Sequence, residues 1–274
     1  MLFGGRGPTP VFDVALLDAL NEEYRDRLIV PNPRKFDAAS RAQQASNRLN
    51  TLHRRLDFTG RRVLEIGCGD GYETWTLANH YGAEAHGVDV ERRNTWADFE
   101  GSNAHYHLAD IGSDSPFPDN FFDRAITFSV WEHMLHPIEA LHDLYRILAP
   151  GGIAHIQAAL HRGMIGSHLY RDIFFPWPHL LFDDHVVEQW YVSKGLPPKR
   201  NAWVNNLTWA HYRQEIVDLG FEVKAFQILT RPFDEEFYQR FQEPLARYGR
   251  FDLAADGFVV VVQKPMAAIT PPTA

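Results

Sequence analysis

The stretch VLEIGCGDG at residues 63–71 constrains the fold of this chain more than any other. Val63, Leu64 and Ile66 form an apolar run that ends abruptly in a segment with three glycines in five residues. This pattern predicts a buried parallel strand that breaks into a glycine loop, with a helix beginning near Tyr72. Glycines allow the backbone to turn sharply and to approach a ligand where a Cβ atom would collide. The loop therefore predicts a ligand site at the end of this strand.

The charges around the loop distinguish two classes of ligand. A dinucleotide would place its pyrophosphate on the N-terminus of the following helix, which requires that no anions lie nearby. Here Glu65, Asp70 and Glu73 surround the loop, and Tyr72 occupies the position of the third glycine in a GxGxxG pattern. Because three carboxylates would repel a pyrophosphate at close range, a positively charged ligand fits better. S-adenosylmethionine meets this condition, since it carries an ammonium and a sulfonium group and no phosphate.

Five segments in order resemble the motifs of the class I S-adenosylmethionine-dependent methyltransferases. The first is VLEIGCGDG, and the others are HGVDV (86–90), ADIGSDSPFPDNFFD (109–123), FSVWEHM (128–134) and LYRILAPGG (144–152). The resemblance runs from Arg62 to Gln157 and returns more weakly up to Lys264. A lone glycine loop is a weak signal, whereas five motifs at the spacing of the family are a strong one. The resemblance implies an enzyme that uses S-adenosylmethionine as methyl donor.

Apolar and polar residues follow the alternating rhythm of strands and helices. Strands are expected at 62–66, 84–89, 104–108, 122–128, 152–158, 221–229 and 257–264, and helices at 11–29, 37–56, 72–81, 137–148, 208–219 and 233–247. This order predicts an α/β fold with a doubly wound parallel sheet, whose ligand lies outside the carboxyl ends of the strands. The resemblance implies a seven-stranded, mostly parallel sheet of the Rossmann-like methyltransferase fold, with the last strand antiparallel.

The chain is expected to divide into four segments. Residues 1–58 are expected to form a helical N-terminal cover, as in many members of the family, and residues 59–264 the methyltransferase domain. Residues 161–207 are an insertion after the fifth strand, which is too long for an ordinary loop and too aromatic to be disordered. We interpret this insertion as a substrate cover, because specificity in the family often lies there. Residues 265–274 are rich in Pro, Ala and Thr and are expected to form a flexible tail.

Composition argues against several classes of partner. The chain has 274 residues and a net charge of -8, and the absence of a long basic cluster argues against a nucleic-acid substrate. The single cysteine, Cys68, cannot form an intramolecular disulfide, and the sequence shows neither an apolar run of transmembrane length nor a signal-peptide core. We therefore expect a cytoplasmic protein that acts on a small molecule and binds neither nucleic acid nor membrane. The oligomeric state stays open, with a homodimer as one alternative.

Two aspartates at strand ends are the principal candidates for cofactor recognition. Asp89 follows the glycines by about 20 residues, where its carboxylate can accept hydrogen bonds from both ribose hydroxyls; the alternative is a helix N-cap near Arg92. The resemblance implies that Asp110 binds the adenine amine and that Ile111 packs on the ring, whereas a turn aspartate before Gly112 is the alternative. The other candidates for cofactor binding are Glu65, Gly67, Cys68, Gly69, Tyr72, Val90, Phe128 and Ser129.

Three of these candidates have specific expected roles. Cys68 is interpreted as a small residue that fits between two glycines, because methyl transfer from a sulfonium requires no covalent enzyme intermediate. Glu65 is expected to form hydrogen bonds with the loop. The resemblance implies that the carbonyl groups of Phe128 and Ser129 lie beside the methionine part of the cofactor.

His133 is the leading candidate for a general base. A neutral imidazole near pH 7 can take the proton of a hydroxyl group as the methyl group arrives. For Glu132 and His133 the alternatives are a helix-start feature and two ligands of an incomplete metal site. Because the set of carboxylates that Mg²⁺ requires is incomplete, we predict no metal, and Mg²⁺ is an unsupported alternative. His161 and His179, in the insertion, are further candidates for a catalytic role.

The insertion also supplies the candidates for substrate contact, which are Tyr170, Phe175, Trp177, His168 and Trp190. Aromatic side chains can stack on a sugar face or an aromatic substrate, although packing within the cover explains them nearly as well. We predict O-methylation of a hydroxyl group on a small molecule, such as a sugar, a glycan or a secondary metabolite. The alternatives are an N-methyltransferase for a small amine, a peptide or protein methyltransferase, and a non-enzymatic cofactor-binding protein. A nicotinamide oxidoreductase is opposed by the acidic loop.

Overall fold

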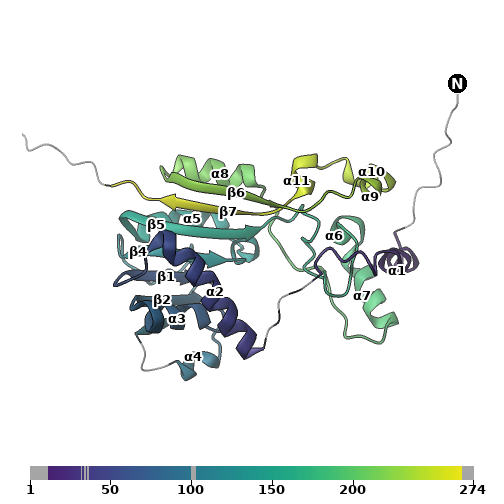
Figure 1. Cartoon of the computed structure of the whole chain (residues 1–274). Helices are drawn as coiled ribbons and strands as arrows, with labels where there is room; N and C mark the ends of the chain where they lie inside the picture. The colour runs from purple at the N-terminus through teal and green to yellow at the C-terminus, as the bar shows by residue number, and fades with distance from the viewer. Residues whose placement is uncertain (1–11, 32, 34, 36, 100–102, 267–274) are drawn as a thin grey trace, which may run out of the picture. The chain divides into compact units, whose positions relative to one another are not determined.

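The computed structural model describes residues 12–31, 33, 35, 37–99 and 103–266 (Figure 1). Residues 1–11 of the expected cover and 267–274 of the expected tail lie outside the described residues. The chain forms two compact units, which we call the sheet unit and the helical unit. The sheet unit takes its described residues from 34–160, 205–229 and 257–274, and the helical unit from 1–33, 161–204 and 230–256.

The sheet unit contains a seven-stranded sheet in the order β3-β2-β1-β4-β5-β7-β6. The strands from β3 to β5 pair in parallel, and β7 pairs with β5 antiparallel. This arrangement confirms the predicted α/β class with a doubly wound, mostly parallel sheet. The strands are β1 (Arg62–Ile66), β2 (Glu84–Asp89), β3 (Ala104–Leu108), β4 (Phe122–Phe128), β5 (Leu148–Ala159), β6 (Glu222–Thr230) and β7 (Ala255–Gln263).

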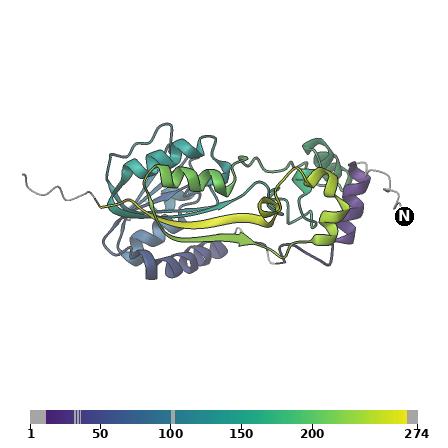
Figure 2. The ribbon, with the colours of Figure 1, turned by 90° about the horizontal axis from the view of Figure 1, so that it is seen from above.

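Helices cover both faces of this sheet (Figure 2). α2 and α3 pack together on one face, and α5 and α8 pack together on the other. Because β1 lies between β2 and β4, the loops that follow these three strands meet at one edge of the sheet. The helices of this unit are α2 (Ala38–Leu56), α3 (Tyr72–Tyr81), α4 (Thr95–Asp98), the 3-10 helix η1 (Trp131–His133), α5 (Pro137–Ile147) and α8 (Trp209–Asp218).

The sequence of α2 determines both where the helix begins and which side it buries. Asp37 is the N-cap, and its carboxylate accepts a hydrogen bond from the amide of Ser40 at 2.9 Å. The buried residues recur every three or four positions, and each fully buried leucine among them contributes about 1.5–3 kcal/mol through the hydrophobic effect. They are Ala45, Leu49, Leu52 and Leu56.

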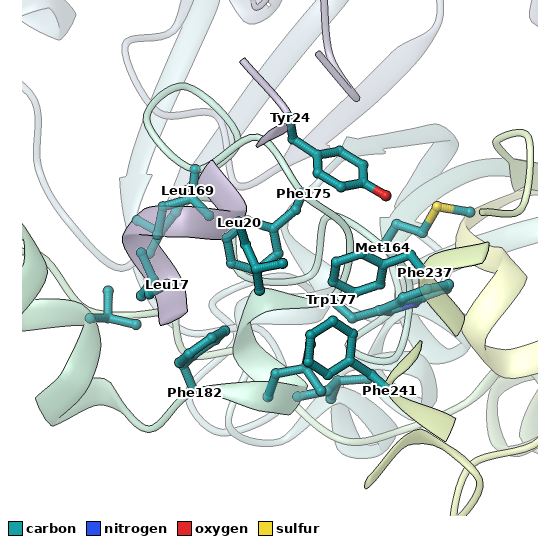
Figure 3. Packing of buried hydrophobic residues seen from close by; sticks show 14 of the residues in the cluster. Leu17, Leu20, Tyr24, Met164, Leu169, Phe175, Trp177, Phe182, Phe237 and Phe241 are labelled. Atoms are coloured by element: carbon teal, nitrogen blue, oxygen red, sulfur yellow. The ribbon is translucent and has the colours of Figure 1, made fainter. Parts of the chain in front are cut away.

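The helical unit has an aromatic core of its own (Figure 3). Its helices are α1 (Val14–Glu23), α6 (Pro178–Leu181), α7 (Asp184–Ser193), α9 (Glu235–Arg240), α10 (Gln242–Leu245) and α11 (Arg250–Ala254). The labelled core side chains come from all three parts of the chain that build the unit. They include Leu17, Leu20, Phe175, Trp177, Phe182, Phe237 and Phe241.

Partly buried hydrogen bonds join these three parts of the chain. The side chain of Asn21 donates to the carbonyl oxygen of Asp172 at 2.8 Å and accepts from the amide of Phe174 at 2.7 Å. The hydroxyl group of Tyr24 donates to Asp234 at 2.6 Å. Since polar groups in an interior must be hydrogen-bonded, these pairs specify how α1 meets the other two segments.

The two units divide the chain differently from the expected segments. The expected N-terminal cover, residues 1–58, is split, because α1 packs with the insertion whereas α2 packs on the sheet. Residues 230–256, which were expected to belong to the methyltransferase domain, join the helical unit. The expected helix at 233–247 is replaced by the shorter α9 and α10.

A histidine cluster lies on β2 and β3. His86 Nδ1 is 3.0 Å from His107 Nε2, and the ring of His105 lies 4.8 Å from that of His86 between centroids. The other nitrogen of His86 lies 3.4 Å from Glu84 Oε1, and the charge of Arg62 also acts on His86. Burial lowers the pKa of His86, and it lowers the pKa of His107 to about 4. Both imidazoles are therefore neutral near pH 7.

We expect the His107→Gln substitution to flatten the acid side of the stability profile. An unfolded histidine titrates near a pKa of about 6.5. The unfolded chain therefore takes up a proton between about pH 6.5 and 4 while the folded chain does not, and the free energy of unfolding falls as the pH falls. Urea unfolding at several pH values across this window measures the slope. The control variant His80→Gln removes an exposed histidine, and an equal flattening in both variants would contradict the prediction.

Candidate cofactor site

The glycine loop between β1 and α3 makes a tight turn. Gly67, Gly69 and Gly71 have φ angles of 72°, 48° and 82°, in the left-handed region that favours glycine. The amides of Gly67 and Cys68 donate to the carbonyl oxygen of Val88 at 2.8 and 3.1 Å. These bonds tie the loop to the end of the neighbouring strand β2.

Two of the loop glycines also lie where a side chain has no room. A Cβ atom on Gly67 would lie 2.2 Å from a methyl carbon of Val130, in the segment after β4. A Cβ atom on Gly71 would lie 2.5 Å from the ring of Tyr106 in β3. Both distances are far inside the normal separation of carbon atoms. Packing against β3 and against the segment after β4 therefore requires glycine at these positions independently of the φ angles.

Two of the three carboxylates near the loop are paired with arginines of α2. Arg41 Nη1 lies 2.5 Å from Asp70 Oδ2, and Arg48 Nη1 lies 2.6 Å from Glu73 Oε1. These ion pairs reduce the negative charge that the loop presents to a ligand. The repulsion of a pyrophosphate by three carboxylates is therefore weaker than the sequence suggests, because α2, which precedes β1, supplies two cations.

The third carboxylate, Glu65, is buried beneath the loop. Its side chain is 3% exposed, and Thr74 Oγ1 donates to its Oε2 at 2.5 Å. Burial and the nearby charge of Glu73 raise the pKa of Glu65. Glu65 therefore acts inside the protein, where it joins β1 to α3. Cys68 is also buried, and burial raises the pKa of its thiol, which keeps it protonated and unreactive.

Asp89 lies at the end of β2 and holds the glycine loop. Its Oδ2 accepts from the amide of Gly69 at 2.9 Å and its Oδ1 accepts from the amide of Glu91 at 3.0 Å. The N-cap of the following helix α4 is Asn94, so Asp89 does not cap that helix. A carboxylate has about four acceptor sites, and these two amides leave acceptor capacity for the hydroxyl groups of a ligand. The next residue, Val90, is 69% exposed.

Asp110 lies beside Asp89 at the same edge of the sheet. The amide of Ala109 donates to the carbonyl oxygen of Asp89 at 3.1 Å, which places the ends of β2 and β3 side by side. The carbonyl oxygen of Asp110 accepts from the amide of Asp114 at 2.9 Å, so a turn begins here. Asp110 is partly exposed, whereas Ile111 is 3% exposed.

A family described as a methyltransferase domain matches residues 38–223, which is more than half of the chain. The chain belongs to this methyltransferase family. The solved structures that it resembles include a Mesorhizobium loti S-adenosylmethionine-dependent methyltransferase, at 18% identity, a TM-score of 0.50 and coverage of 76% of this chain and 92% of that one. The [4+2]-cyclase SpnF gives a TM-score of 0.51 at 17% identity, with 86% of each chain covered. At these identities, the likeness shows the shared fold.

The curated relatives share part of their length with this methyltransferase. Tocopherol O-methyltransferase of Arabidopsis thaliana is 30% identical over 168 residues, which is 57% of this chain and 44% of the relative. O-methyltransferase cnsE of Penicillium expansum is 33% identical over 34% of this chain and 36% of its own. The tRNA U34 carboxymethyltransferase of Saccharophagus degradans is 28% identical over 40% of this chain and 35% of its own. The chain thus spans about half or less of these relatives.

The observed residues fit S-adenosylmethionine, the cofactor that the resemblance implies. The Cβ position of Gly69 faces open space, with nothing within 4 Å, and Asp89 keeps acceptor capacity at the neighbouring strand end. Asp110 follows β3, the next strand in the sheet after β2. The adjacent ends of β1, β2 and β3 can therefore hold the amino acid, the ribose and the adenine parts of the cofactor in this order.

The segment after β4 carries backbone strain beside the glycine loop. Ser129 has a φ angle of 57°, which is uncommon for a residue with a side chain and typical of functional sites. Its amide donates to the carbonyl oxygen of Gln157 in β5 at 2.8 Å, and Phe128 packs under the guanidinium group of Arg48 at 4.7 Å. The contact of Val130 with Gly67 then sets the distance between this segment and the loop.

Glu132 and His133 lie together on η1 but in different surroundings. Glu132 is fully buried, whereas His133 is exposed. Asn205 holds the backbone of η1, because its amide donates to the carbonyl oxygen of Glu132 and its side chain donates to that of Trp131, both at 2.8 Å. The hydroxyl group of Tyr212 donates to Asn205 Oδ1 at 3.2 Å, and burial together with the charge of Glu132 raises the pKa of Tyr212. Of the two adjacent candidates, His133 is therefore the one that solvent reaches.

His161 and His179 pack on each other within the helical unit. His179 Nε2 lies 2.5 Å from the carbonyl oxygen of His161, and the ring centroids are 5.0 Å apart. Burial lowers the pKa of His161, and it lowers the pKa of His179 to about 3. A general base is most effective when its pKa lies near the working pH. His179 is therefore a weak proton acceptor.

The aromatic candidates for substrate contact fall into two groups within the helical unit. Phe175, Trp177 and Trp190 are 1%, 0% and 4% exposed and belong to the core of the unit. All three pack in this core, and the ring N–H groups of Trp177 and Trp190 also donate hydrogen bonds, to the carbonyl oxygen of Leu253 and to the carboxylate of Asp18. Tyr170 and His168 are partly exposed.

The structure adds residues that the sequence analysis did not select. Arg41 and Arg48 of α2 lie outside the five motifs, and only the fold brings them to the loop. Thr95, Trp96 and Tyr106 donate side-chain hydrogen bonds to the loop. The single local signal was that Thr95 and Trp96 follow Asp89 closely in the chain.

Among the helices of the described ranges, none is both long and apolar enough to span a bilayer.

We expect Gly67→Ala to weaken binding of S-adenosylhomocysteine by at least ~10-fold, which corresponds to ~1.4 kcal/mol. The new methyl group would meet Val130, and relief of this clash must move the loop or the segment after β4. The matched control is Gly82→Ala, since Gly82 has a φ of 64° with nothing within 4 Å of the added Cβ atom. Isothermal titration calorimetry measures both affinities. Equal losses in the two variants would show that backbone strain alone accounts for the effect.

Proposed function

We propose that this methyltransferase transfers the methyl group to a hydroxyl oxygen of a small molecule, with His133 as the general base. The observation that carries the proposal is the exposure of His133 on η1, directly after the strained segment that follows β4. Its neighbour Glu132 is buried, and His179 has a low pKa, so neither competes with it for this role. An imidazole suits a hydroxyl acceptor, which must lose its proton as the methyl group arrives.

The names of two relatives support an oxygen acceptor on a small molecule. The tocopherol O-methyltransferase and the O-methyltransferase cnsE both match part of this chain. The relatives that are tRNA U34 carboxymethyltransferases make a nucleic-acid acceptor the second candidate. The net charge of -8 opposes that candidate, because nucleic-acid binding depends on cationic contacts with phosphates.

The chemistry is an in-line displacement that the protein promotes by alignment. Bound S-adenosylmethionine supplies a methyl group on a sulfonium centre that is already activated for departure. The acceptor oxygen forms a bond to the methyl carbon while the carbon–sulfur bond breaks, and the electron pair of that bond stays on sulfur. His133 takes the hydroxyl proton. Alignment of two reacting groups contributes up to ~7–11 kcal/mol to such a step.

The remaining residues have positioning roles in the proposal. Asp89 accepts hydrogen bonds from the ribose hydroxyls while it holds Gly69, and Asp110 accepts from the adenine amine. The carbonyl groups of Phe128 and Ser129 would contact the methionine part of the cofactor. In the helical unit, Tyr170 and His168 are the candidates for acceptor contact, because they are partly exposed.

We expect His133→Gln to lower kcat for hydroxyl acceptors by ~10²–10⁴-fold, the usual contribution of a general base. The affinity for S-adenosylhomocysteine should stay within about twofold of the parent enzyme, because His133 acts on the acceptor and the glycine loop is unchanged. Methyl transfer from labelled S-adenosylmethionine is measured against a panel of phenols, sugars, small amines and bulk tRNA.

The control for this substitution is His136→Gln, three residues along the same segment and also exposed. Equal rates for His133→Gln and His136→Gln with a hydroxyl acceptor would exclude His133 as the base. Turnover of amines alone would favour an N-methyltransferase, and labelling of tRNA alone would favour the nucleic-acid acceptor.

A further inference from the structure

Three consecutive carbonyl groups of the glycine loop each accept a hydrogen bond from a side chain. Trp96 Nε1 donates to the carbonyl oxygen of Gly69 at 2.8 Å. Thr95 Oγ1 donates to that of Asp70 at 2.9 Å, and the hydroxyl group of Tyr106 donates to that of Gly71 at 3.0 Å. The three donors come from outside the loop, from α4 and from β3.

The same part of the chain holds the other side of the loop. Asp89 accepts from the amide of Gly69, while Trp96 donates to the carbonyl oxygen of that residue. Both peptide groups that flank the Gly69 Cα atom are thus fixed by residues only seven positions apart in the sequence. The residue proposed to bind ribose and the donors on α4 therefore act on the loop as one segment.

Two of the donors brace each other. The rings of Trp96 and Tyr106 are stacked, with centroids 5.3 Å apart and an interplanar angle of 19°. Trp96 is 3% exposed, and the ring of Tyr106 fills the space next to Gly71 where a Cβ atom would otherwise fit. A donor held in this way loses little further freedom when it forms its hydrogen bond.

We propose that Thr95, Trp96 and Tyr106 are positioning residues that hold the glycine loop in its cofactor-binding conformation. A loop of three glycines has many accessible conformations, and the ordering of such a loop on binding reduces affinity. Bonds from outside direct the three carbonyl groups away from the ligand before it arrives. This role of the three residues in cofactor binding does not depend on which acceptor the enzyme methylates.

The test removes the two braced donors while it keeps an aromatic ring at each position. In the double variant Trp96→Phe with Tyr106→Phe, we expect the Kd for S-adenosylhomocysteine to rise about 10- to 30-fold, in keeping with the loss of two ordinary hydrogen bonds. Saturating S-adenosylmethionine should restore a kcat within about twofold of the parent enzyme, because a preformed loop affects binding more than the chemical step. Amide hydrogen exchange at residues 69–72 should be faster without ligand and return to the parent rate with ligand.

Two matched variants control for the loss of ring atoms and hydroxyl groups. Trp75→Phe alters a tryptophan whose ring contacts Phe99 in the same aromatic group and which is not one of the three donors. Tyr81→Phe removes a hydroxyl group that donates to Asn50 at 2.7 Å on α2. Both controls should keep the parent affinity and the parent exchange rates.

An affinity of the double variant within twofold of the parent would overturn the proposal. A weaker affinity with unchanged exchange at residues 69–72 would also overturn it, because the effect would then arise elsewhere. If the double variant does not fold, Thr95→Val replaces it, since this change removes one donor with little change of volume. For Thr95→Val we expect a rise of about fivefold in Kd with faster loop exchange, in keeping with the loss of one bond.

Discussion

The cofactor site depends on a backbone constraint between β1 and α3. The chain must pass through left-handed conformations at Gly67, Gly69 and Gly71, and at two of these positions a Cβ atom would collide with β3 or with the segment after β4. Because the collisions are with Val130 and Tyr106, the loop has one position relative to those elements. The constraint thereby aligns the ends of β1, β3 and β4, and the hydrogen bonds of the loop to Val88 and Asp89 add the end of β2. The residues proposed to bind the cofactor lie at these strand ends.

The charge balance of the site differs from what composition suggests. An acidic chain with three carboxylates near one loop indicates an anionic pocket, yet Asp70 and Glu73 are neutralised by Arg41 and Arg48. The arginines lie seven residues apart, so both project toward α3 from one side of α2. What distinguishes this site from a pyrophosphate site is therefore Asp89 at the end of β2 and the shape of the loop, more than its net charge.

The sheet unit could be predicted from the sequence in detail, and the helical unit could not. Each strand and each long helix of the sheet unit has a local signal, such as the Asp37 cap of α2 or the glycines after β1, whereas the short α4 and η1 were not among the expected helices. The helical unit depends on contacts between residues far apart in the chain, such as Asn21 with Asp172. A single sequence shows that Trp177 is apolar, but only the partner segments reveal that it is fully buried. The pairing of Arg48 with Glu73 was hidden for the same reason.

Asn205 holds the backbone of η1 in place at the end of the long insertion. It is the residue at which the chain returns to the sheet unit after 161–204, and its two hydrogen bonds hold the backbone of η1, on which His133 lies. Loss of the donor from a buried backbone acceptor costs about 1–3 kcal/mol. The two hydrogen bonds therefore hold Asn205 in place next to η1. In the proposed function, these two hydrogen bonds therefore fix the backbone that carries the base.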